Sequence, residues 1–210
     1  MVNNLYTVKS EAAKGRSYHH GSLRQALIDA AEAVIAERGL DSFSLRETAR
    51  RAGVSAAAPA HHFKDVRGLL TAIAAQAFAD LADALEAATF AAGPNREARI
   101  KAQGMAYVAF ALDRPARFDV MWRKALLDYD DPRLKEAGDR AFDLLDRVVR
   151  PGGEPSCGST DPALAPSIAA WSLVHGFARL AIDGAFGAEA DSAELAADAL
   201  LPLILDRLMV

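Results

Sequence analysis

One stretch, residues 44–63, constrains the fold more than any other, because it reads as two short helices joined by a tight turn. Ser44 and Glu47 stand three positions apart, a spacing at which each side chain can bond the other's backbone N–H and start a helix. Gly53 suits the left-handed residue that ends this helix, and Ser55 is placed to cap the second one. The pattern of helix, glycine turn and helix predicts a helix-turn-helix motif.

The rest of the chain predicts an all-α protein. Half of the residues are apolar (51%), a quarter are charged (25%), and few turn signals interrupt the Ala-, Leu-, Glu- and Arg-rich segments. No clear alternating strand pattern occurs, so helices are favoured throughout. We expect nine helices, of which three form a small head, one links and five form a body. Outside the motif, the predicted helices cover 23–38 (capped by Ser22), 66–91, 95–112, a segment from Pro115, 132–149, 163–186 and 192–209.

Charge divides the chain in the same way as the helices. We expect a flexible basic arm over residues 1–17, a helix-turn-helix domain over 18–65 and a body over 66–210, in which 66–92 is the linking helix. Residues 1–70 carry ten Lys and Arg against seven Asp and Glu, whereas the remaining 140 carry fourteen against twenty-one. A basic head on an acidic body is the polarity expected when the head alone meets phosphate.

Residue usage argues against several other classes. Cys157 is the only cysteine, so no intrachain disulfide forms and a reducing compartment fits. No run of about 18 apolar residues occurs and no apolar segment lies near residue 1, so we expect a cytoplasmic protein without a membrane partner. Catalytic and phosphate-loop motifs are missing, so we expect that the protein is not an enzyme and uses no cofactor. The pairs His19-His20 and His61-His62 have no neighbouring Cys or Asp cluster, so no metal site is expected.

The motif and the helix layout together resemble the tetracycline-repressor (TetR) family of bacterial regulators. The most specific similarity covers about residues 22–73, where AERGLDSFSLRETARRAGVSAAAPAHHFKDVRGLL follows the family's pattern. Residues 18–21, 115–122 and 171–176 resemble a branch with a Trp-His-Gly-type effector domain. The resemblance implies a nine-helix fold and a homodimer whose heads bind a palindromic operator in double-stranded DNA. It also implies that the body binds an unknown small-molecule effector, with repression as the default outcome.

The resemblance also implies which residues meet DNA. The first residues of the third helix would face base edges, and others would contact phosphate; the candidates are Tyr18, Ser44, Arg46, Ser55, Ala56, Ala57, Ala58, Ala60, His61, His62, Lys64 and Arg67. Alanine methyl groups offer no bidentate hydrogen bond to a base, so His61 supplies the polar group for direct readout. Family members usually carry an aromatic residue at Ala60 and Lys at Val66. The alternative is therefore a dimeric ligand- or protein-binding module whose head binds DNA weakly or no longer does so.

Aromatic and polar residues of the body are the candidate ligand site. They are Tyr107, Phe110, Phe118, Met121, Trp122, Trp171, His175 and Arg179. Aromatic and Met side chains at helical spacing are also what an ordinary core contains, so that interpretation stays open. His175 and Arg179 lie one helical turn apart and are placed to fix the polar end of a ligand. They are equally suited to pair with Asp113, Asp119 or Asp183.

The last two predicted helices are candidates for a homodimer interface. The helix predicted over 163–186 is apolar on two sides, and a helix that is apolar all round needs cover on both. One side against the core and one against a second subunit is the simplest solution, and the helix over 192–209 would complete a four-helix interface. A buried central helix in a monomer is the alternative. Pro202 is expected to kink the last helix.

Overall fold

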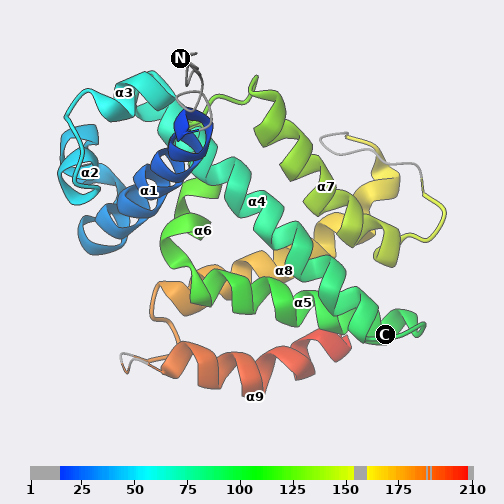
Figure 1. Cartoon of the computed structure of the whole chain (residues 1–210). Helices are drawn as coiled ribbons and strands as arrows, with labels where there is room; N and C mark the ends of the chain where they lie inside the picture. Colours follow the sequence, from blue (N-terminus) through cyan, green and yellow to red (C-terminus); the bar gives the residue numbers. More distant parts are fainter. Residues whose placement is uncertain (1–14, 154–159, 188, 190, 208–210) are drawn as a thin grey trace, which may run out of the picture. The chain divides into compact units, whose positions relative to one another are not determined.

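The protein is all-α, as the sequence predicts. The computed structural model describes residues 15–153, 160–187, 189 and 191–207, and within these ranges it contains nine α-helices, three 3-10 turns and no strand (Figure 1). The α-helices are α1 Gly15–Arg38, α2 Leu45–Arg51, α3 Ala58–Phe63, α4 Val66–Ala91, α5 Arg96–Asp113, α6 Pro115–Trp122, α7 Pro132–Val149, α8 Ala165–Ile182 and α9 Ser192–Arg207. The 3-10 turns are η1 Leu40–Ser42, η2 Lys124–Leu126 and η3 Pro162–Leu164.

The chain divides into two compact units, Met1–Asp65 and Val66–Val210. In the first unit, α2 packs against both α1 and α3. Leu27, Val34 and Ala49 are buried in its core. The guanidinium of Arg24 on α1 lies 5.0 Å from the centre of the Phe63 ring at the end of α3, so a cation–π contact joins the first and last helices of the unit.

The helix-turn-helix begins as predicted. The Ser44 hydroxyl accepts a hydrogen bond from the backbone N–H of Glu47 at 3.3 Å and caps α2. Gly53 has φ of 68°, the left-handed conformation that ends the helix without a side-chain clash. The prediction that Ser55 caps the next helix is wrong: α3 begins at Ala58, and it is the Ser55 carbonyl that accepts from the Ala58 N–H at 3.0 Å. Pro59 explains the later start, because proline is favoured in the first turn of a helix.

The first helix is longer than predicted. α1 begins at Gly15, so Ser22 lies inside the helix and does not cap it. Residues 15–17, assigned from the sequence to the basic arm, are also helical, because nothing between Gly15 and Ser22 has the fixed φ that breaks a helix. The rest of that arm, residues 1–14, lies outside the described residues.

In the second unit, α4 packs against α5, α6 and α7. Its most apolar 18-residue window meets the length and hydropathy of a membrane span, but 61% of that window is buried inside the fold, as in a core helix. Side-chain caps define the next starts: the Asn95 side chain accepts from the Ala98 N–H at 2.8 Å, and Asp131 accepts from the N–H groups of Arg133 and Leu134. α7 therefore begins at Pro132 as predicted, and α5 begins at Arg96, one residue after the predicted start.

α8 is shorter than predicted, and α9 begins at Ser192 as predicted. α8 spans 165–182 instead of 163–186, because Asp161 starts the separate turn η3 and Gly184 takes φ of 78° after the helix. α9 passes through Pro202 and is described as far as Arg207. The loop predicted over 151–162 lies partly outside the described residues.

Candidate DNA-binding surface and ligand cavity

The predicted base-reading residues lie in the turn before α3 and along its exposed side. Ser55, Ala56, Ala57, Ala60 and His61 are exposed, and Ala58 and His62 are partly buried. Pro59 and Phe63 are buried and hold α3 in the unit. α3 therefore presents small side chains and one exposed imidazole, which permits close approach to a groove but little direct hydrogen bonding to bases.

Exposed cations lie near this surface, and two further arginines, Arg50 and Arg51, form ion pairs. Arg46 is exposed in the first turn of α2. Arg50 donates to the Glu47 carboxylate at 2.7 and 2.9 Å, and Arg51 donates to Glu37 at 2.5 Å. The Arg50 hydrogen bonds lower the pKa of Glu47 to about 2. Arg50 and Arg51 thus stabilise the motif, as an ion-paired face does.

Lys64 and Arg67 were both predicted to contact phosphate, and their settings differ. Lys64 is exposed and has φ of 72° and ψ of −58°. The Asp65 N–H donates to the Phe63 carbonyl at 2.9 Å, which makes Lys64 the centre of a strained γ-turn. Arg67 donates to the Ala125 carbonyl at 3.1 Å within the second unit. Tyr18 lies in the first turns of α1, and its side chain lies outside the described part.

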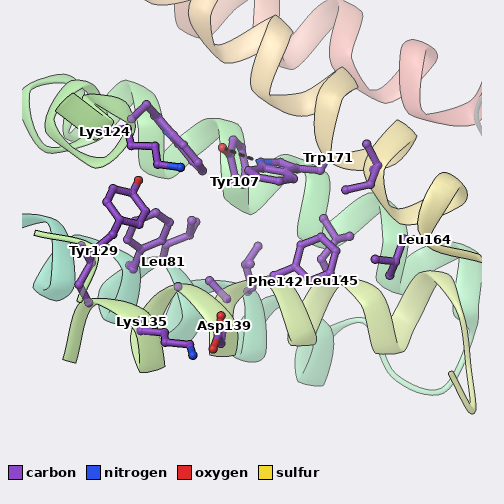
Figure 2. A pocket seen from close by; sticks show the side chains of 17 residues that line it. Leu81, Tyr107, Lys124, Tyr129, Lys135, Asp139, Phe142, Leu145, Leu164 and Trp171 are labelled. Carbon is purple, nitrogen blue, oxygen red and sulfur yellow. Dashed lines mark hydrogen bonds between the residues drawn. The ribbon is translucent and has the colours of Figure 1, made fainter. Parts of the chain in front are cut away.

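The second unit contains a cavity of about 610 Å³, within the range of small-molecule sites (Figure 2). Its walls are mostly apolar and come from α4, α5, the end of α6, the segment after α6, α7, η3 and α8. The lining residues are Phe78, Leu81, Leu85, Tyr107, Trp122, Lys124, Tyr129, Leu134, Lys135, Gly138, Asp139, Ala141, Phe142, Leu145, Leu164, Ile168 and Trp171.

Three of the eight predicted ligand residues line this cavity, namely Tyr107, Trp122 and Trp171. Phe110, Phe118 and Met121 are buried and are not among its lining residues; Phe118 packs edge-on against Tyr107 at 5.9 Å between ring centres. The ordinary-core interpretation therefore describes these three better. Sequence reasoning could not separate wall from core, because both are apolar at helical spacing.

A hydrogen-bonded group lies beside the cavity. The Tyr107 hydroxyl accepts from Trp171 Nε1 at 3.4 Å and lies 3.0 Å from His175 Nδ1, to which it can donate. Burial raises the pKa of Tyr107, and burial together with Arg179 lowers the pKa of His175. A neutral imidazole and a neutral phenol therefore face each other. This contact fixes Tyr107 and Trp171 in the wall and leaves both side chains without charge.

Arg179 follows the ion-pair alternative. Its guanidinium lies 3.3 Å from Asp119 and 2.8 Å from Asp183. It is not a lining residue of the cavity, and nor is His175. The sequence placed these two residues on one helical face correctly, but their partners come from α5, α6 and the end of α8.

The charged lining residues Lys124, Lys135 and Asp139 were all missed from the sequence, together with some uncharged ones. Lys135, Gly138 and Asp139 come from α7, and Lys124 and Tyr129 come from the segment that joins α6 to α7. The helical spacing of Leu134, Ala141, Phe142 and Leu145 was the available signal, because it gives α7 an apolar side that has to face the body. They were missed because the aromatic-rich helices gave the more conspicuous pattern.

The segment 123–131 also joins the cavity wall to the start of α4. The Asp128 N–H donates to the Thr71 hydroxyl at 2.9 Å, and the Ala125 carbonyl accepts from Arg67 at 3.1 Å. Both α4 residues lie in its first two turns, immediately after Asp65 in the chain. Lys124 and Tyr129 in the cavity wall therefore belong to the same short segment that is hydrogen-bonded to the first turns of α4.

A helix-turn-helix unit and a helical unit with a cavity define a class of protein in which one chain carries both a DNA-reading motif and a small-molecule site. The family model of bacterial regulatory proteins of the tetR family matches residues 27–73, and the tetracyclin repressor-like C-terminal domain matches residues 100–203. The chain belongs to the tetR family.

Solved structures share this fold over most of the chain. A protein of unknown function from Rhodococcus sp. RHA1 is 36% identical, with a TM-score of 0.67, 88% of this chain covered and 96% of that one. The TetR family transcriptional regulator PfmR from Thermus thermophilus is 22% identical, with a TM-score of 0.63, 86% of this chain covered and 94% of that one. The likeness to PfmR concerns the fold alone.

Curated relatives match a smaller part of the chain. The HTH-type transcriptional regulator BetI from Cronobacter sakazakii is 42% identical over 64 residues, which are 30% of this chain and 32% of that protein. BetI from Serratia proteamaculans is 41% identical over 63 residues. The chain thus matches about a third of the length of these regulators.

Proposed function

We propose that this protein is a ligand-responsive transcriptional regulator, a repressor that leaves a palindromic operator when a small molecule fills the cavity of its body. The observation that carries the proposal is the helix-turn-helix geometry: a capped α2, the Gly53 turn and an α3 whose outer side is exposed. The cavity in the second unit supports the effector role. Family membership is consistent with both.

DNA binding is the first point to test. The purified protein is titrated with its own upstream DNA and with scrambled DNA of equal length at several salt concentrations. Arg46→Ala and Lys64→Ala are expected to weaken binding on all sequences and to reduce the slope of log affinity against log salt by about 1 for each lost phosphate contact. Lys101→Ala is the matched control, because Lys101 pairs with Asp206 in the second unit.

The rival function is a dimeric binding module whose head no longer binds DNA. Ala60 and Val66 keep this alternative open, because both are exposed and neither can contact phosphate as the family's usual aromatic and Lys do. Selection from random DNA decides between the two. Enrichment of a palindrome supports the regulator, and no enrichment at low salt supports the module.

The homodimer is proposed to use α8 and α9. The inner face of α9 is occupied: Leu201 and Leu205 are buried, and a Cβ on Gly104 of α5 would lie 2.8 Å from Leu205. On the outer faces Leu180, Leu195 and Leu203 are 53%, 60% and 62% exposed. Large exposed apolar side chains on two helices are what a protein interface would cover.

Induction is proposed to act through the segment 123–131. A ligand that shifts Lys124 or Tyr129 moves the hydrogen bonds to Arg67 and Thr71 and biases the orientation of α4. Since α4 follows the helix-turn-helix directly, the two heads of a dimer then no longer match half-sites about 34–36 Å apart. The ligand can shift this equilibrium only by its difference in affinity for the two states.

A further inference from the structure

We propose that the effector of this protein is an apolar monocarboxylate, with its carboxylate at Lys124 and its hydrocarbon body in the apolar part of the cavity. The inference rests on the proposed function in one respect only, since it takes the cavity as the effector site. It names the chemical class of the ligand, which the fold by itself leaves open.

Several of the labelled apolar lining residues lie away from Lys124, although Leu81 lies beside Tyr129 (Figure 2). Lys124 and Tyr129 lie at one end, whereas Leu145, Leu164 and Trp171 lie toward the other. The apolar end is large, because leucines and aromatic rings from α4, α7 and α8 contribute to it. A ligand that fills such a space has a polar group at one end and an apolar body.

Charge at the polar end favours an anion. The Lys124 side chain extends toward the middle of the cavity, and Lys135 and Asp139 lie together at its lower edge (Figure 2). Lys135 and Asp139 stand four positions apart on α7, so their opposite charges offset each other. Lys124 is then the uncompensated charge of the wall, and one anionic group on the ligand balances it.

The surroundings of Lys124 leave its ammonium available. Among the described residues it has no carboxylate within ion-pair distance, and its nitrogen lies 5.3 Å from the centre of the Tyr129 ring. That ring contact leaves the N–H donors of the ammonium open to an oxygen acceptor. Burial raises the pKa of Tyr129, so its phenol stays protonated and is able to donate as well.

An indole N–H in the wall also lacks an acceptor. Nε1 of Trp122, two residues before Lys124, is buried and has no hydrogen-bond partner among the described residues. A buried donor without a partner costs about 1–3 kcal/mol; because this nitrogen has almost no accessible surface, a ligand oxygen reaches it only if the indole ring turns toward the cavity. A carboxylate has enough lone pairs to accept from more than one such donor.

The rival ligand is an organic cation, because Trp171, Trp122 and Phe142 bring aromatic faces together and Asp139 carries a negative charge. Ring centres lie 5.4 Å apart for Trp122 and Trp171, and 5.9 Å apart for Phe142 and Trp171. An ammonium held there would gain cation–π energy. It would also share the cavity with the ammonium of Lys124, and that repulsion favours the anion.

The test uses three probes with one hydrocarbon body: decanoate, decanol and decylammonium. The protein has two tryptophans, and both line the cavity, so tryptophan emission reports on its occupancy without any DNA. We expect decanoate to bind most tightly, decanol more weakly and decylammonium weakest. Tighter binding of decylammonium than of decanoate, or no emission change with any of the three, overturns the proposal.

Lys124→Met supplies the second measurement. Its affinity for decanoate is expected to fall roughly 10- to 100-fold, the range for a lost hydrogen bond to a charged group, while its affinity for decanol stays unchanged. Lys101→Met is the matched control and should change neither value, because Lys101 pairs with Asp206 and is not a lining residue. An equal loss for decanoate and decanol would mean a packing effect and would overturn the assigned role of Lys124.

Failure of this inference is distinguishable from failure of the proposed function. Preference for the ammonium in the emission assay, with specific binding to operator DNA intact, rejects the carboxylate and keeps the regulator. Selective decanoate binding by a protein that enriches no DNA sequence rejects the regulator and keeps the carboxylate site.

Discussion

At the scale of single residues, the backbone conformation and the side chain of Lys64 favour different residue types. Its positive φ is a conformation that glycine adopts freely and lysine does not. Its ammonium is exposed beside the DNA-reading helix. A residue held in a strained conformation next to a functional surface indicates that its side chain is needed there.

We therefore predict that Lys64→Gly and Lys64→Ala separate the backbone effect from the side-chain effect. The Gly variant should be more stable than the Ala variant by about 1 kcal/mol, because only Gly relieves the strain. Both should lose the same DNA affinity, since both lack the ammonium. Denaturant unfolding measures the first effect and salt-titrated DNA binding the second. Equal stability of the two variants would count against a strained γ-turn.

At the scale of elements, α7 carries much of the cavity wall and depends on its cap. Asp131 Oδ1 accepts from the N–H groups of Arg133 and Leu134 at 2.9 and 3.4 Å. Hydrogen bonds from the Arg133 side chain lower the pKa of Asp131 from its ordinary value of 3.8 to about 2. Because the pKa is lower in the folded state, the stabilisation is complete above pH 3.8 and disappears as the pH falls through 2.

Asp131→Ala is predicted to reduce the free energy of unfolding by about 0.5–2 kcal/mol at pH 7, the usual effect of losing a helix cap. Its difference from the wild type should shrink as the pH falls from 3.8 toward 2. Thermal unfolding monitored by circular dichroism over this pH range measures both. Asp130→Ala is the control, because Asp130 is exposed and its neighbour Asp131 holds the cap. An Asp131→Ala variant as stable as Asp130→Ala at pH 7 would contradict the role of the cap.

At the scale of the whole molecule, the exposed leucines of α8 and α9 predict the assembly. A charge at an interface core is left unpaired and desolvated, so Leu195→Asp with Leu203→Asp should convert a dimer into a folded monomer. Sedimentation velocity gives the mass, and helical circular dichroism shows that the fold persists. Asp198→Asn, at an exposed polar position of α9, is the control. A double variant that sediments as the wild type would place the interface elsewhere.

How far sequence reasoning reached depended on the kind of signal. Caps, prolines and positive-φ glycines act within a few residues, so Ser44, Gly53, Asn95 and Asp131 were readable directly. The cavity depends on which helical faces meet in three dimensions. Tyr107, Trp122 and Trp171 were found by residue type, whereas Lys124 was missed because it joins the cavity wall only through the way the segment after α6 folds.

The two hydrogen bonds between the segment 123–131 and α4 have a thermodynamic consequence. If they couple the cavity to the heads, ligand and operator share one coupling free energy, and DNA must weaken ligand binding by the same factor by which ligand weakens DNA binding. Thr71→Val removes the hydroxyl that accepts from the Asp128 N–H. The factor by which ligand weakens DNA binding and the factor by which DNA weakens ligand binding should then fall together, while the affinity for each partner in the absence of the other is nearly retained. With the coupling intact, operator-bound protein needs a higher effector concentration than free protein, by the same factor by which the effector weakens operator binding.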